Sequence, residues 1–178
     1  MHLSRRIPAI CTVRTQSNRS SWPTLPTSGG PRAADRSRGR VWLAPRALGA
    51  LALLATGAVH LQQFERFYSQ IPTIGTLFVL NFAGATAIGL ALLAPVERAG
   101  GRYGGAILVL LAAAGIALAA VAFAFLLISE HTPLFGFQEP GYDPPAIAAA
   151  RGAEIATVFF LGAVLVGRVG LKAPMWRW

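Results

Sequence analysis

Cysteine is almost missing from this chain of 178 residues, because Cys11 is the only one. A single cysteine excludes a disulfide framework within the chain and a cage of cysteine ligands around a metal ion. Charge is also scarce: Asp, Glu, Lys and Arg make up 13% of the residues, against about 25% in a typical soluble domain. The sequence has no phosphate-binding loop, nucleophile elbow, dinucleotide fingerprint or zinc-protease helix, so it indicates no reaction.

Acidic residues are nearly absent from positions 1–45, where Asp35 is the only one. This segment is rich in Arg, Ser, Pro, Thr and Gly, and it cannot bury enough apolar surface to offset the entropy of ordering. We therefore expect a disordered, basic cytoplasmic tail. Nine of the 16 basic residues lie in the first 46 positions, so the net charge of +9 does not indicate a nucleic-acid-binding face.

Long apolar runs are what the chain has in excess, since 54% of its residues are hydrophobic. A helix needs about 20 residues to cross about 30 Å of hydrocarbon, and it satisfies its own backbone there. Alanine and leucine dominate the runs, which favours helices over strands, and proline lies at or outside their ends. The fold class predicted is all-α, a transmembrane four-helix bundle (46–170) with spans at about 46–67, 73–94, 104–128 and 146–169.

Small residues recur within these spans at the spacing of helix packing. Ala83, Ala87 and Ala91 predict one packing ridge on the second span, and Gly115 with Ala119 predicts another on the third. Small side chains let helix backbones approach closely. Such close packing drives helix association in a membrane, because moving an apolar side chain from lipid to a helix interface provides no hydrophobic stabilisation.

Lysine and arginine are unevenly distributed between the connections. The connection 95–103 carries Arg98 and Arg102, the C-terminal end 171–178 carries Lys172 and Arg177, and the connection 129–145 carries no lysine or arginine. The positive-inside rule then places both termini and the middle connection in the cytoplasm. We expect a multi-pass protein of the plasma membrane whose partner is the lipid bilayer, with a second copy or other membrane subunits as further candidates.

Polar residues interrupt the spans at four places: His60, Asn81, Arg151 and Glu154. At about 1.5 Å per residue, the first, second and last of these lie about 10 to 12 Å below the outer ends of their spans, and Arg151 lies one turn higher. A charge in hydrocarbon costs about 3 kcal/mol or more, so these groups should face the bundle interior. Arg151 and Glu154 are three residues apart and are expected to pair. Glu130 and His131 could cap the same polar layer.

This layer has two interpretations. It is either a hydrogen-bonded clasp that sets helix register, or a pocket for a proton, a quinone-like head group or another small ligand. His60, His131 and Glu154 would be acceptable metal ligands, but no short ligand spacing supports a metal site, so none is predicted. The sequence names no cofactor.

The outer connection 129–145 holds Phe135, Phe137 and Glu139 between glycine and proline turns. Aromatic residues at this position are typical of the headgroup layer. The segment is either a short lid over the polar layer or an ordinary turn anchored by its aromatic rings.

Two segments suggest a family: HLQQFERFYSQIPTIGTLFVLN (60–81) and LFGFQE (134–139), together with Glu154 in the last span. Over about residues 46–170 the chain resembles an uncharacterised family of small four-span integral membrane proteins of high-GC actinobacteria. The resemblance implies a topology and no reaction, and it carries over His60, Asn81, Glu139 and Glu154. Gln138 departs from it, because the family pattern has arginine there, which puts a charge role at that position in doubt.

The function expected is therefore that of a polytopic, non-enzymatic or accessory membrane protein with a polar layer in the outer leaflet. One alternative is a membrane redox or quinone-interacting protein that uses His60 and Glu154. Another is half of a dimeric proton-coupled transporter, although four spans are few for alternating access.

Overall fold

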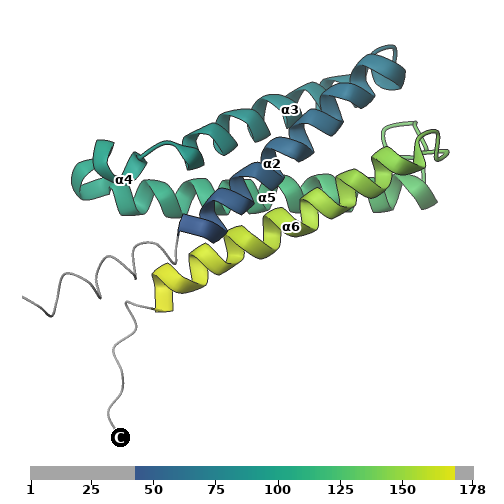
Figure 1. Ribbon diagram of the computed structural model, residues 1–178. Coiled ribbons are helices and arrows are strands. Elements are labelled where there is room, and N and C mark those ends of the chain that lie inside the picture. Colours follow the sequence, from purple (N-terminus) through teal and green to yellow (C-terminus); the bar gives the residue numbers. More distant parts are fainter. Residues whose placement is uncertain (1–42, 171–178) are drawn as a thin grey trace, which may run out of the picture.

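The computed structural model describes residues 43–170, and every regular element in that range is helical (Figure 1). The predicted tail, apart from its last three residues, and the predicted C-terminal end 171–178 lie outside the described residues. The elements are α2 (Leu43–Gln63), which continues into a π-helix η1 (Phe64–Tyr68), then α3 (Pro72–Leu93), α4 (Val96–Ala99), a 3-10 turn η2 (Gly101–Tyr103), α5 (Gly104–His131) and α6 (Pro144–Gly170).

The helix ends follow from proline and aspartate chemistry. Pro72 is the first residue of α3, and Ile71 before it is extended, as the residue preceding a proline prefers to be. Asp143 precedes α6, and its Oδ1 accepts a hydrogen bond from the amide of Ala146 at 3.2 Å. This is an N-cap contact that satisfies one of the free amides of the first turn.

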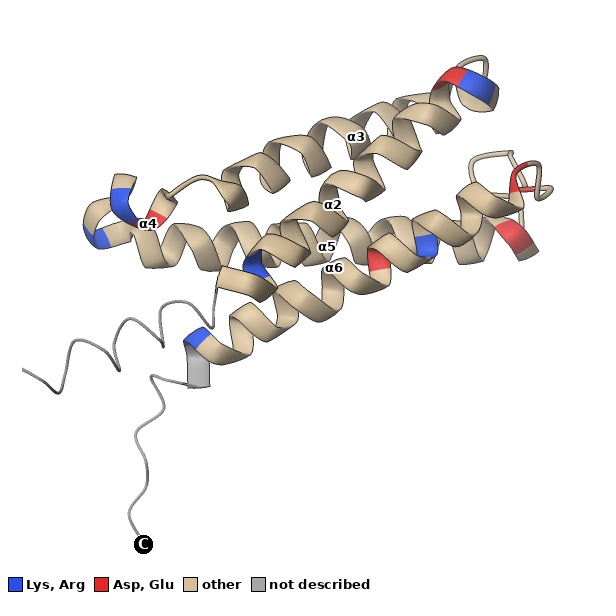
Figure 2. Ribbon diagram, in the orientation of Figure 1, with Lys and Arg blue, Asp and Glu red and all other residues tan. Residues whose placement is uncertain are grey.

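Four helical segments of 22 to 31 residues are long and apolar enough to cross a membrane. Large apolar side chains on the outside of the bundle remain exposed, among them Leu110 at 68% and Val166 at 74%. Most charged residues gather toward the two ends, and the exceptions, Arg151 and Glu154, lie within α6 (Figure 2). The predicted all-α four-helix bundle is confirmed, and its apolar exterior is that of a multi-pass membrane protein.

The bundle consists of two helical hairpins that meet at one end and separate toward the other (Figure 1). We call the end where α2 begins and α4 lies the terminal end. The opposite end, which carries η1 and the segment 132–143, is the loop end. The hairpin of α2 and α3 diverges from the hairpin of α5 and α6 toward the loop end.

The apolar core lies in the half of the bundle next to the terminal end. Glycines bring the helices close there: a Cβ at Gly115 would lie 2.8 Å from the Leu161 side chain, and one at Gly89 would lie 2.8 Å from Leu54. Gly115 and Ala119 are buried as predicted, whereas Ala83 and Ala87 face outward. The core residues are Ala50, Leu53, Ala85, Leu92, Leu108, Ala112 and Leu161.

Arg46 closes the terminal end below this core. Its guanidinium donates to Leu92 O at 2.6 Å, to Ala94 O, and to Glu97 Oε2 at 3.0 Å. Arg168 at the end of α6 pairs with the other oxygen of Glu97. The carbonyls left free at the C-terminal end of α3 thus receive a cation, which also suits the negative end of the helix dipole. We call Arg46, Glu97 and Arg168 the arginine clasp.

Candidate functional site

A cavity of about 230 Å³ lies at the loop end, where the two hairpins separate. All four long helices, η1 and the segment after α5 contribute to its wall. The polar lining residues are His60, Gln63, Tyr68, Asn81, Ser129, Glu139 and Glu154. Three of the four polar residues that interrupt the predicted spans therefore meet in one place.

Asn81 and Glu154 are the buried polar groups of this cavity that lack partners. They are 7% and 1% exposed, and within residues 43–170 neither Asn81 Oδ1 nor Glu154 Oε2 has a hydrogen-bond partner. A buried, unsatisfied polar atom is rare in a folded protein, because it loses its water without a replacement. These atoms are the part of the cavity wall that a bound molecule would satisfy.

His60 is held by its own helix. Its Nδ1 lies 2.8 Å from the carbonyl oxygen of Thr56, one turn earlier in α2. Since a carbonyl only accepts, Nδ1 carries the hydrogen, and in the neutral ring Nε2 is left as an acceptor. The ring centroid lies 5.0 Å from that of Phe78 on α3. His60 therefore presents an acceptor and a ring, in a fixed tautomer.

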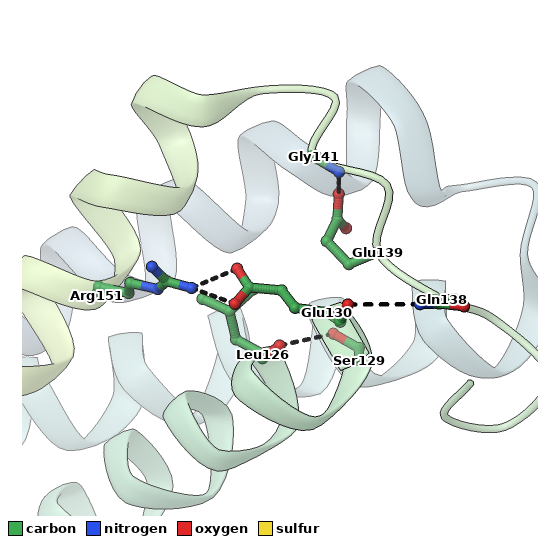
Figure 3. A network of polar contacts seen from close by, with 7 residues as sticks. All are labelled: Leu126, Ser129, Glu130, Gln138, Glu139, Gly141 and Arg151. Carbon is green, nitrogen blue, oxygen red and sulfur yellow. Dashed lines mark hydrogen bonds and ion pairs between the residues drawn. The ribbon is translucent and has the colours of Figure 1, made fainter. Parts of the chain in front are cut away.

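The expected pair of Arg151 and Glu154 is not what the structure contains. Arg151 donates instead to both carboxylate oxygens of Glu130 in the last turn of α5 (Figure 3). A helical side chain leans toward the N-terminus of its helix, so Arg151 reaches toward the loop end, where Glu130 lies. The order of the two also matters, because an acid placed before its base on a helix pairs better than the reverse.

Two other predicted residues lie away from the cavity. His131 is exposed at the end of α5, and Phe135 is 59% exposed and packs edge-on against Phe125 at 6.1 Å. The ligand set of His60, His131 and Glu154 is therefore not assembled. In the described part of the chain, no three His, Cys, Asp or Glu side chains form a group that could hold a metal ion.

The segment 132–143 closes the loop end of the cavity. Leu134 and Phe137 exchange backbone hydrogen bonds of 2.7 and 3.0 Å across a tight turn, in which Phe135 and Gly136 have φ of 53° and 82°. Positive φ at both central positions is the signature of a type I′ turn, which favours glycine. Phe137 and Glu139 line the cavity, so this segment includes part of its wall.

Glu139 fastens that segment to the opposite hairpin. Its carboxylate accepts from the hydroxyl of Tyr68 and from the amide of Gly141 at 2.9 Å, and its own amide donates to Ser129 O at 2.8 Å. Figure 3 shows the Glu139–Gly141 contact beside the Arg151–Glu130 pair. Unlike Glu154, this acid has its partners within the protein.

Sequence reasoning missed Gln63 and Tyr68 as site residues. Gln63 Nε2 donates to Asp143 Oδ2 at 3.0 Å, which joins α2 to the start of α6. Gln63 shares the helical stripe of Thr56 and His60, and that spacing indicates a polar inner face on the first span. Tyr68 could not be found this way, because η1 changes the helical register: Ser69 N bonds to Phe64 O at 2.9 Å, five residues back.

The cavity also reaches the outer surface of the bundle. Leu80 on α3 and Val121 on α5 both line it, yet they are 60% and 51% exposed. These helices belong to different hairpins, so the cavity borders the apolar exterior where the hairpins separate.

No family model matches this chain, and neither a curated protein nor a solved structure is significantly similar to it. The site must therefore be interpreted from its own chemistry.

Proposed function

We propose that this protein is a non-enzymatic, multi-pass protein of the plasma membrane that binds a small molecule in the loop-end cavity. The observation that carries the proposal is Glu154, which is 1% exposed, has no partner in the described residues and lies in the wall of the loop-end cavity. An ionisable residue inside a membrane bundle is costly, so it marks a functional site by default.

The wall of the cavity supports ligand binding. Ligand sites are mostly apolar with a few convergent polar groups, and this wall combines aliphatic and aromatic side chains with Asn81, Glu154 and His60. Its volume of about 230 Å³ is smaller than the roughly 300 Å³ at which drug-sized sites begin. A single ring or a polar head group fits this space, and an apolar remainder could leave between Leu80 and Val121.

The test is recovery of a bound molecule from the full chain, extracted from its membrane in mild detergent and analysed by mass spectrometry. Ala150 is buried and lines the cavity, while its neighbour Ala149 is exposed on the same helix. Ala150→Phe should abolish recovery of the molecule, and Ala149→Phe should retain it. Glu154→Gln preserves the shape of the side chain and adds no bulk, and it should also reduce recovery of the molecule. Equal recovery from all variants, or no molecule from the wild type, would contradict the proposal.

A quinone-interacting role is the second candidate, and the aromatic wall favours it. Tyr68 stacks on Phe78 with centroids 4.7 Å apart, and Phe137 meets Tyr68 edge-on at 5.5 Å. Aromatic rings arranged in this way suit a planar head group. Purified protein with no copurifying quinone and no visible absorbance would remove this candidate while leaving the cavity proposal intact.

Both termini are proposed to be cytoplasmic. Arg98 and Arg102 at the terminal end support this orientation, because the segment 132–143 at the loop end has no lysine or arginine. Single cysteines at the exposed positions Gln138 and Arg98, in a Cys11→Ser background, provide the test. A membrane-impermeant maleimide applied to intact cells should label the cysteine at 138 and leave the one at 98 unlabelled, and the reverse pattern would refute the orientation.

A further inference from the structure

We propose that the molecule bound in the loop-end cavity is a lipophilic monocation, such as an amine with an apolar body. This inference rests on the proposed function and specifies its ligand class. It follows from the charges of the wall, from which of them are already neutralised, and from the rings around them.

The charged residues of the wall have one sign. Glu139 and Glu154 line the cavity, and its lining includes no lysine or arginine. Two acids in one wall disfavour an anion, because the repulsion of like charges is stronger in the interior of a protein than in bulk water. An anionic ligand is therefore disfavoured.

Only one of the two acids needs a partner. Glu139 accepts from Tyr68 and Gly141, so its charge is already stabilised by hydrogen bonds. Within residues 43–170 Glu154 accepts no hydrogen bond, and the base nearest to it along α6, Arg151, donates to Glu130. The place for a positive charge is therefore beside Glu154.

The remaining polar groups offer acceptors to a bound molecule. Nδ1 of His60 donates to Thr56 O, which leaves Nε2 as an acceptor, and Asn81 Oδ1 has no partner in the part of the chain that the structure describes. A ligand that donates hydrogen bonds satisfies these atoms, whereas one that only accepts leaves them unpaired. A protonated amine donates and also carries the charge that Glu154 lacks.

The rings of the wall strengthen this preference. Tyr68, Phe78, Phe125 and Phe137 all line the cavity, and the faces of aromatic rings attract cations, more strongly when water is excluded. Leu80 and Val121 line the cavity and are also exposed on the apolar exterior, so the ligand's apolar body matches the surroundings on that side.

The experiment compares three probes that share a benzyl frame and differ in charge: benzylammonium, benzyl alcohol and phenylacetate. Isothermal titration calorimetry on the full chain in non-ionic detergent at pH 7 gives their affinities. Benzylammonium should bind roughly tenfold more tightly than benzyl alcohol, the difference that about one charge-assisted hydrogen bond makes. Phenylacetate should not bind.

Two variants test the role of Glu154. Glu154→Gln should lower the affinity for benzylammonium to that of benzyl alcohol. Glu130→Gln should also weaken benzylammonium binding, because Arg151 loses its partner and becomes available to Glu154. The control is Glu65→Gln, which removes an exposed acid outside the cavity wall and should leave the affinity unchanged.

The outcomes separate this inference from the function it rests on. If benzyl alcohol or phenylacetate binds most tightly and Ala150→Phe blocks it, the cation inference is wrong and the binding function stands. If no probe binds and no molecule is recovered from the membrane, both fail. Benzylammonium binding that survives Glu154→Gln would overturn the assignment of Glu154 as its partner.

Discussion

At the terminal end of the bundle, the buried Arg46 donates to two backbone carbonyls and to Glu97, which Arg168 also contacts. At the loop end, Glu154 is more deeply buried, at 1% against 7% exposure, and has no partner within the described residues. The same apolar bundle thus contains one buried ionisable group whose hydrogen bonds are made and another whose hydrogen bonds are not made within the described residues.

Packing also differs between the two ends, and it is closer at the terminal end. The core at the terminal end is closed by glycines whose missing side chains let neighbouring helices touch, as at Gly89 and Gly115. At the loop end the hairpins separate around a cavity, and the cross-links between them come from polar contacts such as Tyr68–Glu139 and Gln63–Asp143.

This difference indicates which end of the bundle contributes most to stability and which end is suited to binding. A buried group that is fully bonded contributes to holding the fold, whereas one left unsatisfied lowers stability unless something else binds it. Proteins retain such local deficits at functional sites and offset them elsewhere. Here the arginine clasp and the glycine-packed core stabilise the fold, and the unsatisfied groups of the cavity lower its stability.

The largest expected effect is at the arginine clasp. Arg46→Met keeps the apolar stem but removes the charge, so Glu97 loses one partner and the carbonyls of Leu92 and Ala94 lose their donor. Arg46 is buried and Glu97 is partly exposed, so the loss comes from the broken pair together with two carbonyls left without a donor, about 3 to 5 kcal/mol in all. The free energy of unfolding, measured by SDS titration in mixed micelles, should fall by about that much.

The control for this change is Arg66→Met at the loop end. The Arg66 side chain is 58% exposed and lies 3.8 Å from Asp143. Exposed pairs of this kind contribute about 0 to 1 kcal/mol, so the variant should unfold close to the wild type. Equal losses from both variants would mean that the two ends do not differ as described.

The second effect tests the close packing next to the clasp. A Cβ at Gly104 would lie 2.5 Å from Glu97 O and 2.6 Å from Glu97 Cα, and backbone atoms cannot rotate aside. Gly104→Ala should therefore lower the free energy of unfolding by about 2 to 3 kcal/mol, as overpacking does. Thermal unfolding monitored by circular dichroism measures it.

Its neighbour supplies the control. Nothing lies within 4 Å of a Cβ at Gly105, one residue further along α5. Gly105→Ala should leave stability unchanged or raise it by less than about 1 kcal/mol, because alanine favours the helix. A similar loss in both variants would contradict a specific role for the close approach of α4, because the higher helix propensity of alanine can only raise stability.

Much of the fold could be predicted from the sequence, because it depends on local patterns. Apolar runs of membrane length, bounded by prolines such as Pro72 and Pro95, determine the number of helices and their approximate ends. Depth along the helix also predicted that His60, Asn81 and Glu154 share a layer, and all three line one cavity.

The partners of polar groups could not be predicted, because they depend on contacts distant in sequence. Arg46 bonds to Glu97 across 51 positions, and nothing in the spacing along the chain identifies that pair. Arg151 has an acid three residues away and pairs with Glu130 on another helix instead.

The packing ridges were predicted only in part, for a similar reason. Small residues occur on several faces of α3, so their spacing does not reveal which face meets a neighbour. Ala85 and Gly89 are buried, whereas Ala83 and Ala87, two of the three residues of the predicted ridge, are exposed.

The smallest expected effect has the opposite sign and distinguishes the two interpretations of the polar layer. Glu154→Leu replaces an unpartnered, buried carboxyl with an apolar side chain that suits the aliphatic and aromatic wall. In ligand-free protein, stability to SDS or heat should rise by about 1 to 2 kcal/mol, because the desolvation penalty disappears. Binding of benzylammonium should be lost in the same variant.

Thr157 provides the matched control, since it is fully buried on α6 close to Glu154 and its hydroxyl donates to Ala153 O at 2.8 Å. Thr157→Val removes a polar group that has a partner and should lower stability by up to about 1 kcal/mol. If Glu154→Leu instead destabilises the protein by about 2 kcal/mol, Glu154 belongs to a clasp that sets helix register. A gain in stability combined with a loss of binding is the result that only a binding site predicts, because there the protein retains an unsatisfied group for its ligand.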